Sequence, residues 1–231
     1  MFAIESENIV GYQSITIEAG TYHLYTATFK NIGTTSQIDL KSIVPVTATG
    51  ATYTGNNRIK IQKLAANGDY GATYNYRNSK GGWCQASTLL DDGAVMLSDG
   101  EAICVYNGET ANVQLRFSGE VNLRPMSVLL PPQTYALVGN MTPVAIDLKG
   151  VQLLNADQES FTSNNRVKVQ KLLSNGDYGP TYNYRTSKGG WCQASTLLDD
   201  GAVMLQAGES MCVYNGESST SVYLLFPSPI Q

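Results

Sequence analysis

One internal repeat constrains the fold of this chain more than any other feature. Residues 56–108 align without a gap with residues 164–216 at an offset of 108, and only ten of the fifty-three positions differ. The stretch SKGGWCQASTLLDDGAVML occurs unchanged in both copies. Self-similarity at a fixed period marks a duplicated structural unit, so both copies must adopt the same fold.

The duplication predicts two domains of similar size. The chain has 231 residues, enough for two units of about 100 to 120 residues that each bury a core. Weakly matching segments precede the strong repeat (14–29 with 127–142), and residues 112–117 correspond to 221–226 after it. We place the boundary near Ser118–Glu120, which predicts domains over residues 1–118 and 119–231 with little linker between them.

The alternation of residue types predicts β-strands throughout. Ile59 and Ile61 alternate with polar neighbours. Tyr74 and Tyr76 do the same after the turn residues Asn67–Asp69, so we expect a hairpin. No stretch of a dozen residues shows a helical period with caps. Short strands between turns predict an all-β fold of two tandem duplicated domains, each a β-sandwich or a small barrel, and we prefer the sandwich.

Charge and composition narrow the classes of partner. Charged residues make up 15% of the chain, against roughly 25% in typical soluble domains, and the net charge is −4. No cluster of Lys and Arg forms the positive surface that a nucleic-acid binder needs, so we expect no nucleic-acid partner. No apolar stretch is long enough for a membrane helix, and residues 1–10 lack the parts of a secretory signal. We expect no membrane span.

The four cysteines recur at the same spacing in both units. Cys84 and Cys104 are twenty residues apart, as are Cys192 and Cys212. Without clustered ligands, and with His23 as the one histidine, we expect no metal site. Three interpretations stay open: one disulfide within each unit, which we prefer and which would imply an oxidising compartment; buried free thiols in apolar strands; or cross-links between units or subunits.

Catalytic motifs are missing from the sequence. A nucleophilic triad would need His23, which has no counterpart in the second unit. The acidic pairs Asp91–Asp92 and Asp199–Asp200 precede glycine, as turns require, and turns are the preferred interpretation over acid–base catalysis. The nucleotide-binding, nucleophile-elbow and calcium-loop motifs are all absent from the sequence. We therefore expect that the chain is not an enzyme and that it binds no cofactor.

Repeated aromatic residues are candidates for contacts with glycans. Tyrosine and tryptophan rings offer an apolar face to a sugar and a polar edge to water. The preferred alternative is structural, with the tryptophans filling a core and the tyrosines lining a sheet. The repeated set is Tyr70, Tyr74, Tyr76, Trp83 and Tyr106 with Tyr178, Tyr182, Tyr184, Trp191 and Tyr214. The candidates within this set are Tyr74, Tyr76, Trp83, Tyr182, Tyr184 and Trp191.

Four polar positions recur although core packing does not explain them. Exposed positions are free to drift, because surface substitutions usually change stability by less than roughly 0.5 kcal/mol. Their preservation indicates either a recent duplication or a surface that is used twice, by an interface or a ligand. These candidates are Lys80, Gln85, Ser87, Thr88, Lys188, Gln193, Ser195 and Thr196.

Short motifs follow one another in a fixed order along the chain. They are Asn8–Tyr12, Gly82–Trp83, Gly100–Asn107 and Gly119–Val121, and the second unit repeats the middle two at Gly190–Trp191 and Gly208–Asn215. This order resembles a group of uncharacterised exported bacterial β-repeat proteins, whose units run from N-x-V-G-Y through G-W and G-E-x-x-x-V-x-N to G-E-V. The second unit departs from that pattern at residues 121–123 and 226–228. The resemblance implies an extracellular or cell-surface location, and implies no catalytic residue or ligand.

These observations favour a non-enzymatic extracellular structural protein. Two like surfaces on one chain can form head-to-tail contacts that propagate, so we expect a subunit of a surface fibre, filament or layer whose partners are copies of itself. Phe2 and Ile4 alternate and could add a strand to a neighbour's sheet. The alternative is a tandem carbohydrate-binding or adhesin module, with glycans as partners and avidity from two equal sites.

Overall fold

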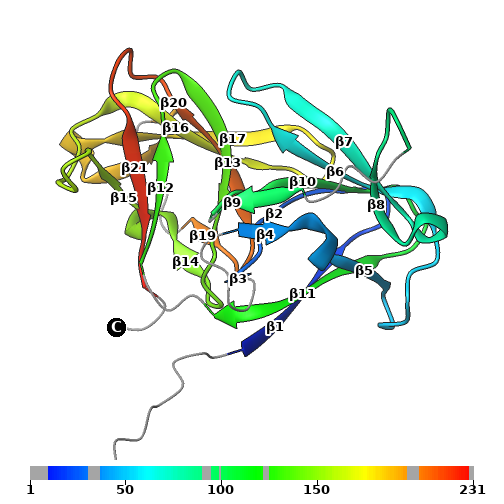
Figure 1. Cartoon of the computed structure of the whole chain (residues 1–231). Coiled ribbons are helices and arrows are strands. Elements are labelled where there is room, and N and C mark those ends of the chain that lie inside the picture. The colour runs from blue at the N-terminus through cyan, green and yellow to red at the C-terminus, as the bar shows by residue number, and fades with distance from the viewer. Residues whose placement is uncertain are drawn as a thin grey trace, which may run out of the picture.

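The chain folds almost entirely into β-structure, with 56% of it in strands and 6% helical. The predicted all-β class is confirmed, and the small sheets are arranged in a ring that resembles a four-bladed propeller (Figure 1). The predicted division into two tandem β-sandwiches stays a prediction. Within the part of the chain that the structure describes, no helix is long and apolar enough to cross a membrane. The structure, a computed structural model, describes residues 10–30, 37–89, 95–98, 100–121, 125–196 and 203–228.

The largest sheet of the first half has five antiparallel strands. Their order is β2 (Tyr22–Tyr25), β10 (Ile103–Asn107), β6 (Asn56–Leu64), β7 (Tyr70–Arg77) and β8 (Gly82–Gln85). Strand β6 shows the expected alternation, because Ile59 and Ile61 are buried and Lys60 is exposed. β6 and β7 form the predicted hairpin. In its turn, the Asp69 N–H donates to Asn67 Oδ1 at 3.1 Å.

Two smaller sheets complete the first half. Strand β11 (Val113–Val121) pairs with β1 (Val10–Ile17), β3 (Phe29–Lys30) and β5 (Val44–Thr47), and β4 (Gln37–Asp39) pairs with β9 (Met96–Ser98). The short 3₁₀ helices are η1 (Leu40–Ser42) and η2 (Asn78–Lys80). Because Gly119 in β11 still pairs with Gly11 in β1, the boundary predicted after residue 118 falls inside a strand. The domain division itself stays a prediction.

The second half repeats this strand order, except that no described strand of its smaller sheet corresponds to β3. Its five-stranded sheet has the order β13 (Thr134–Gly139), β20 (Ser210–Asn215), β16 (Asn164–Leu172), β17 (Tyr178–Arg185) and β18 (Gly190–Gln193). The smaller sheets are β12 (Met126–Leu130), β21 (Val222–Phe226) and β15 (Gln152–Leu154), and β14 (Ile146–Asp147) with β19 (Met204–Leu205). The 3₁₀ helices are η3 (Leu148–Gly150) and η4 (Thr186–Lys188). The repeat in sequence is thus a repeat in topology.

Each half has a hydrophobic core built from both of its larger sheets. Trp83 is 4% exposed in the first core, and its Nε1–H donates to the Ile43 carbonyl at 2.9 Å. Trp191 is 5% exposed in the second core and donates to the Val151 carbonyl at the same distance. A buried indole N–H needs such a partner, so both tryptophans belong to the cores.

The two halves meet about an approximate two-fold axis. The Tyr22 N–H donates to the Ser174 carbonyl at 2.9 Å, and the Tyr135 N–H donates to the Ala66 carbonyl at 2.8 Å. Tyr22 occupies the position of Tyr135 in the repeat, and Ala66 that of Ser174. This hydrogen bond from the first half to the second is therefore returned by an equivalent bond from the second half to the first, which is the pattern of an isologous interface.

Apolar side chains fill the centre of this interface. The cluster takes equivalent residues from both halves, with Leu24 and Leu137 3% exposed each. Its buried members are Leu24, Ala102, Cys104, Leu137 and Cys212, and Leu64 and Leu172 pack against them. Burial of this patch stabilises the halves against each other, since each Å² of buried apolar surface contributes roughly 25 cal/mol.

The predicted disulfides are not formed, because all four cysteines are free and buried. Cys84 lies on β8 and Cys104 on β10, and strands β6 and β7 separate them. Three strand spacings of about 4.8 Å each exceed the roughly 7 Å that a disulfide allows between Cα atoms. The same separation holds for Cys192 and Cys212. The prediction was wrong because strand order, which the spacing of cysteines does not reveal, decides which of them meet.

Several predicted features lie outside the described residues. They are the strand-addition candidates Phe2 and Ile4, the Asn8 end of the opening motif, and the acidic turns at Asp91–Asp92 and Asp199–Asp200.

Candidate functional site

The outward face of each five-stranded sheet carries a row of side chains that is the same in both halves. Since Ile59 and Ile61 point to the core, Lys60 and Gln62 point to the opposite face. The strand register places one outward residue of each strand beside the next. The first row is Tyr22, Tyr106, Lys60, Asn75 and Cys84, and in the second half Tyr135, Tyr214, Lys168, Asn183 and Cys192.

A second row runs alongside the first, two residues further along each strand. It consists of Leu24, Cys104, Gln62 and Thr73, and in the other half of Leu137, Cys212, Gln170 and Thr181. The two halves carry the same residue types at every position of both rows. The repeat therefore preserves an outward-facing surface as well as a core.

One small pocket lies between these rows in each half. The cavity of the first half has a volume of about 170 Å³ and that of the second about 230 Å³. Sites for drug-sized ligands have roughly 300–1,000 Å³, so each of these pockets suits a single small group. The lining residues are Tyr22, Lys60, Gln62, Thr73, Cys104 and Tyr106, and in the second half Tyr135, Lys168, Gln170, Thr181, Cys212 and Tyr214.

Paired tyrosines form one wall of each pocket. The ring centroids of Tyr22 and Tyr106 are 4.6 Å apart, and those of Tyr135 and Tyr214 are 4.4 Å apart. The Lys60 ammonium lies 5.7 Å from the centroid of the Tyr106 ring, within the range of a cation–π contact. The described lining thus combines aromatic surface, an amide, a hydroxyl and one positive charge.

In each pocket, one tyrosine of the wall packs against a hairpin turn of the other half. The hairpin turn of the second half places Gly176 against the ring of Tyr22, and that of the first half places Gly68 against Tyr135. A Cβ atom on Gly176 would lie 3.0 Å from Tyr22 Cδ2, and its φ of +93° also favours glycine. The position of each pocket tyrosine therefore depends on the partner repeat.

A polar chain crosses the two-fold axis between the pockets. The hydroxyls of Tyr70 and Tyr178 lie 3.2 Å apart, and each is hydrogen-bonded to the cysteine of its own half, Cys104 or Cys212. Burial raises the pKa of both thiols, and the tyrosine hydrogen bonds oppose this shift only in part. The thiols stay protonated at neutral pH, which makes them poor nucleophiles.

The structure places the predicted aromatic contact residues in or against the cores. Trp83 and Trp191 are core residues, as described above. Tyr76 and Tyr184 meet these tryptophans edge to face, with ring centroids 5.4 and 5.2 Å apart. The remaining two, Tyr74 and Tyr182, also pack against the cores. These six side chains are directed away from the pocket face of the sheet.

The repeated polar candidates lie at the outer edge of each five-stranded sheet. Lys80 precedes β8, whereas Ser87 and Thr88 follow it, and all three are exposed. Gln85 ends the strand and is half-buried. Four residues of strand span about 13 Å, so these side chains do not form one cluster. Their counterparts Lys188, Gln193, Ser195 and Thr196 have the same placement around β18.

Two of the pocket tyrosines, Tyr106 and Tyr214, belong to the repeated aromatic set. The sequence also contained a signal for Tyr22 and Tyr135, which the predictions did not use. Between the weakly matching segments 14–29 and 127–142 only four of sixteen positions are identical. Tyr22 with Tyr135, and Leu24 with Leu137, are two of these four pairs. Preservation inside a diverged segment marks the pocket and the interface between the halves more sharply than preservation inside the strong repeat.

The described residues include no group of three or more His, Cys, Asp or Glu side chains placed to hold a metal ion. Comparison with protein-family models and with curated proteins finds no match for this chain. The pockets themselves are therefore the ground for a functional proposal.

Proposed function

We propose that this chain is a non-enzymatic protein that binds carbohydrate through two equal pockets. The observation that carries the proposal is the pair of pockets, whose lining residues are the same in both halves. A face that only had to remain soluble would be free to vary, because surface substitutions rarely change stability by more than roughly 0.5 kcal/mol. Tyr22 and Tyr135 are kept even though their surroundings have diverged.

The chemistry of the lining suits a sugar ring. Tyrosine rings pack against the apolar face of a sugar, while amide, hydroxyl and phenol groups exchange hydrogen bonds with its hydroxyls. The volumes of about 170 and 230 Å³ suit one sugar residue each. Lys60 and Lys168 give each described lining a positive charge without a carboxylate, which favours an acidic sugar over a neutral one.

The duplication gives this function an advantage in avidity. Two equal sites on one chain bind a repeating glycan more strongly than either site alone, provided that the glycan spans both. The hydrogen bonds across the axis hold the two pockets at a constant separation, so a polymer with a matching repeat is preferred.

Titration calorimetry of the full chain tests the proposal, with ligands first chosen on a glycan array. The wild type is expected to bind two sugar units per chain. Lys60→Ala is expected to weaken one of the two sites about 10- to 100-fold, since a hydrogen bond to a charged group contributes roughly 1.5–3 kcal/mol. The double variant Lys60→Ala/Lys168→Ala is expected to weaken both.

The matched control removes two other repeated lysines. Lys80→Ala/Lys188→Ala changes the net charge by the same amount at exposed positions on the outer edges of the sheets. It is expected to leave both sites intact. Absence of any glycan binding, or equal loss in the two double variants, would contradict the proposal.

We further propose that each half is a β-sandwich. Two features support this: each half has its own core with residues from a five-stranded and a smaller sheet, and the two halves share one strand order. An extracellular location is also a proposal, supported by the low charged fraction and by the resemblance to exported β-repeat proteins. Detection of the native chain in the culture medium or on the cell surface would test it.

The fibre-subunit hypothesis is the second candidate. It rests on like surfaces that make head-to-tail contacts, yet one pair of like surfaces in this chain already meets about a two-fold axis, an arrangement that closes. A fibre would have to use other surfaces, such as the outer edges at β8 and β18. Electron microscopy and light scattering of the purified chain test it, and a monomer at high concentration would contradict it.

A further inference from the structure

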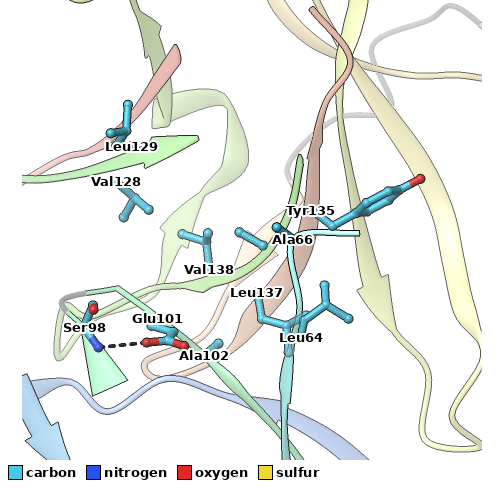
Figure 2. A pocket seen from close by; sticks show the side chains of 11 residues that line it. Leu64, Ala66, Ser98, Glu101, Ala102, Val128, Leu129, Tyr135, Leu137 and Val138 are labelled. Carbon is cyan, nitrogen blue, oxygen red and sulfur yellow. Dashed lines mark hydrogen bonds between the residues drawn. The ribbon is translucent and has the colours of Figure 1, made fainter. Parts of the chain in front are cut away.

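A third cavity opens where the two halves meet, on one side of the two-fold axis. Figure 2 shows it between strands β12 and β13, the end of β6, and Ser98, Glu101 and Ala102. Its volume is about 280 Å³. The walls are mainly apolar, and Leu129, 48% exposed, stands at the rim. One carboxylate lines the cavity, that of Glu101, whose Oε2 accepts a hydrogen bond from the Ser98 N–H at 2.9 Å.

Larger side chains stand at three of the equivalent positions across the axis. Ala136 pairs with β20 at the position where His23 pairs with β10. In the same way, Val138 corresponds to Tyr25. Ser98 corresponds to Gln206 in the repeat. The cavity is therefore bounded by small side chains where the first half carries an imidazole and a phenol ring.

The surroundings of this position are otherwise matched. Lys63 Nζ lies 2.8 Å from Glu101 Oε1 beside the cavity, and Lys171 Nζ lies 2.5 Å from Glu209 Oε1 across the axis. Burial lowers the pKa of His23, and the charges of Glu209 and Lys171 act on its ring with opposite signs. The His23 ring is therefore uncharged at neutral pH, in the electrostatic field of the ion pair of the other half. Ala136 leaves the same place beside Lys63–Glu101 open.

We propose that this cavity binds a small molecule with an uncharged imidazole-type ring, which takes the place that His23 occupies across the axis. The apolar walls formed by Val128 and Leu129 pack against the faces of the ring. The Lys63–Glu101 ion pair lies beside the cavity, and across the axis the charges of the matching pair, Lys171 and Glu209, act on the His23 ring. This site is distinct from the carbohydrate pockets, although Tyr135 lines both this cavity and the carbohydrate pocket of the second half.

An NMR titration of the full chain with 4-methylimidazole, the side chain of histidine as a free molecule, tests the proposal. The titration is run at pH 9, because the free ring is more basic than a histidine side chain, whose pKa is about 6.5, and is mostly uncharged only at this higher pH. The wild type is expected to bind one equivalent, with shifts of the Val128, Leu129 and Val138 methyl signals. Ala136→His is expected to weaken binding at least ten-fold, because its own ring fills the site. Ala136→Ser, the matched control, is expected to bind like the wild type.

The reverse variant gives a second, independent readout. His23→Ala opens the equivalent place across the axis and is expected to bind two equivalents of 4-methylimidazole. If His23→Ala does not fold, the pair Ala136→His and Ala136→Ser decides alone. Unchanged binding by Ala136→His, shifts confined to other regions, or no binding by the wild type overturns the proposal. Tighter binding of p-cresol than of 4-methylimidazole also overturns it, since the ring class would then be that of Tyr25.

Discussion

The two tryptophans illustrate how a single repeated residue is assigned to packing or to ligand contact. Trp83 is 4% exposed and its indole N–H has a buried acceptor in Ile43, so it contributes to the core. We expect Trp83→Ala to lower the free energy of unfolding by about 3–5 kcal/mol, the usual cost of deleting a buried tryptophan side chain. Chemical denaturation measures this. A Trp83→Ala chain of unchanged stability that has lost glycan binding would assign the residue to the ligand instead.

Tyr178 makes the free energy of unfolding fall at alkaline pH. Burial raises the pKa of Tyr178 from 10 to about 12, and burial also raises that of Tyr70, its partner across the axis. The unfolded chain loses the Tyr178 proton near pH 10 and the folded chain only near pH 12. This contribution to stability is therefore complete below pH 10 and is lost as the pH rises from 10 to 12. Denaturation midpoints at several pH values should show this fall, with a shallower slope in Tyr70→Phe/Tyr178→Phe. An equal slope in the two proteins would contradict the assignment.

Alanine substitutions at two glycines separate the effect of backbone strain from the effect of a lost contact between the halves. Gly176 and Gly81 both have positive φ, +93° and +76°, so alanine at either position costs about 1–2 kcal/mol. A Cβ atom on Gly176 also meets the Tyr22 ring at 3.0 Å, whereas no atom lies within 4 Å of one on Gly81. We expect Gly176→Ala to be the more destabilising and to weaken binding in the pocket of the first half. Calorimetry on both variants tests this, and equal effects would show that the turn does not support the pocket.

Strand order limits what could be predicted at the scale of elements. Alternation within β6 and β7 predicted their hairpin, because side-chain direction in a strand follows from sequence position alone. The pairing of Cys84 with Cys104 could not be judged in this way, since two other strands separate them in the sheet. The pocket depends on the same information. Lys60 and Tyr22 are distant in sequence. They line the same pocket because both are paired with Tyr106 on β10, which lies between their strands.

At the scale of the whole molecule, the duplication predicted two like units but not how they meet. The interface depends on reciprocal contacts such as Tyr22 with Ser174, between segments that align only weakly. The cavity beside Ala136 lies open where the counterpart position in the first half carries the larger side chain of His23. The predictions from the sequence were based on the positions that the two copies share, and not on those that differ. In the folded chain, one of those differences separates an open site from a filled one.

The reciprocal interface leads to a prediction for the first half alone. Residues 1–121 carry both sides of the reciprocal hydrogen bonds, because Tyr22 and Ala66 occupy the positions of Tyr135 and Ser174. Two copies can therefore repeat the interface about a true two-fold axis, with Tyr70 against its own copy and Leu24 in the shared apolar patch.

We expect residues 1–121 to form a dimer with two pockets in sedimentation and glycan titration. Leu24→Glu is expected to give monomers, because it places an uncompensated charge in the patch. Since each pocket tyrosine is held by the partner repeat, those monomers should also bind sugar weakly. A wild-type fragment that stays monomeric and binds sugar with full affinity would show that the halves only share a chain. If the fragment is a dimer and Leu24→Glu abolishes both dimerisation and sugar binding, the result would show that duplication converted an intermolecular site into an intramolecular one.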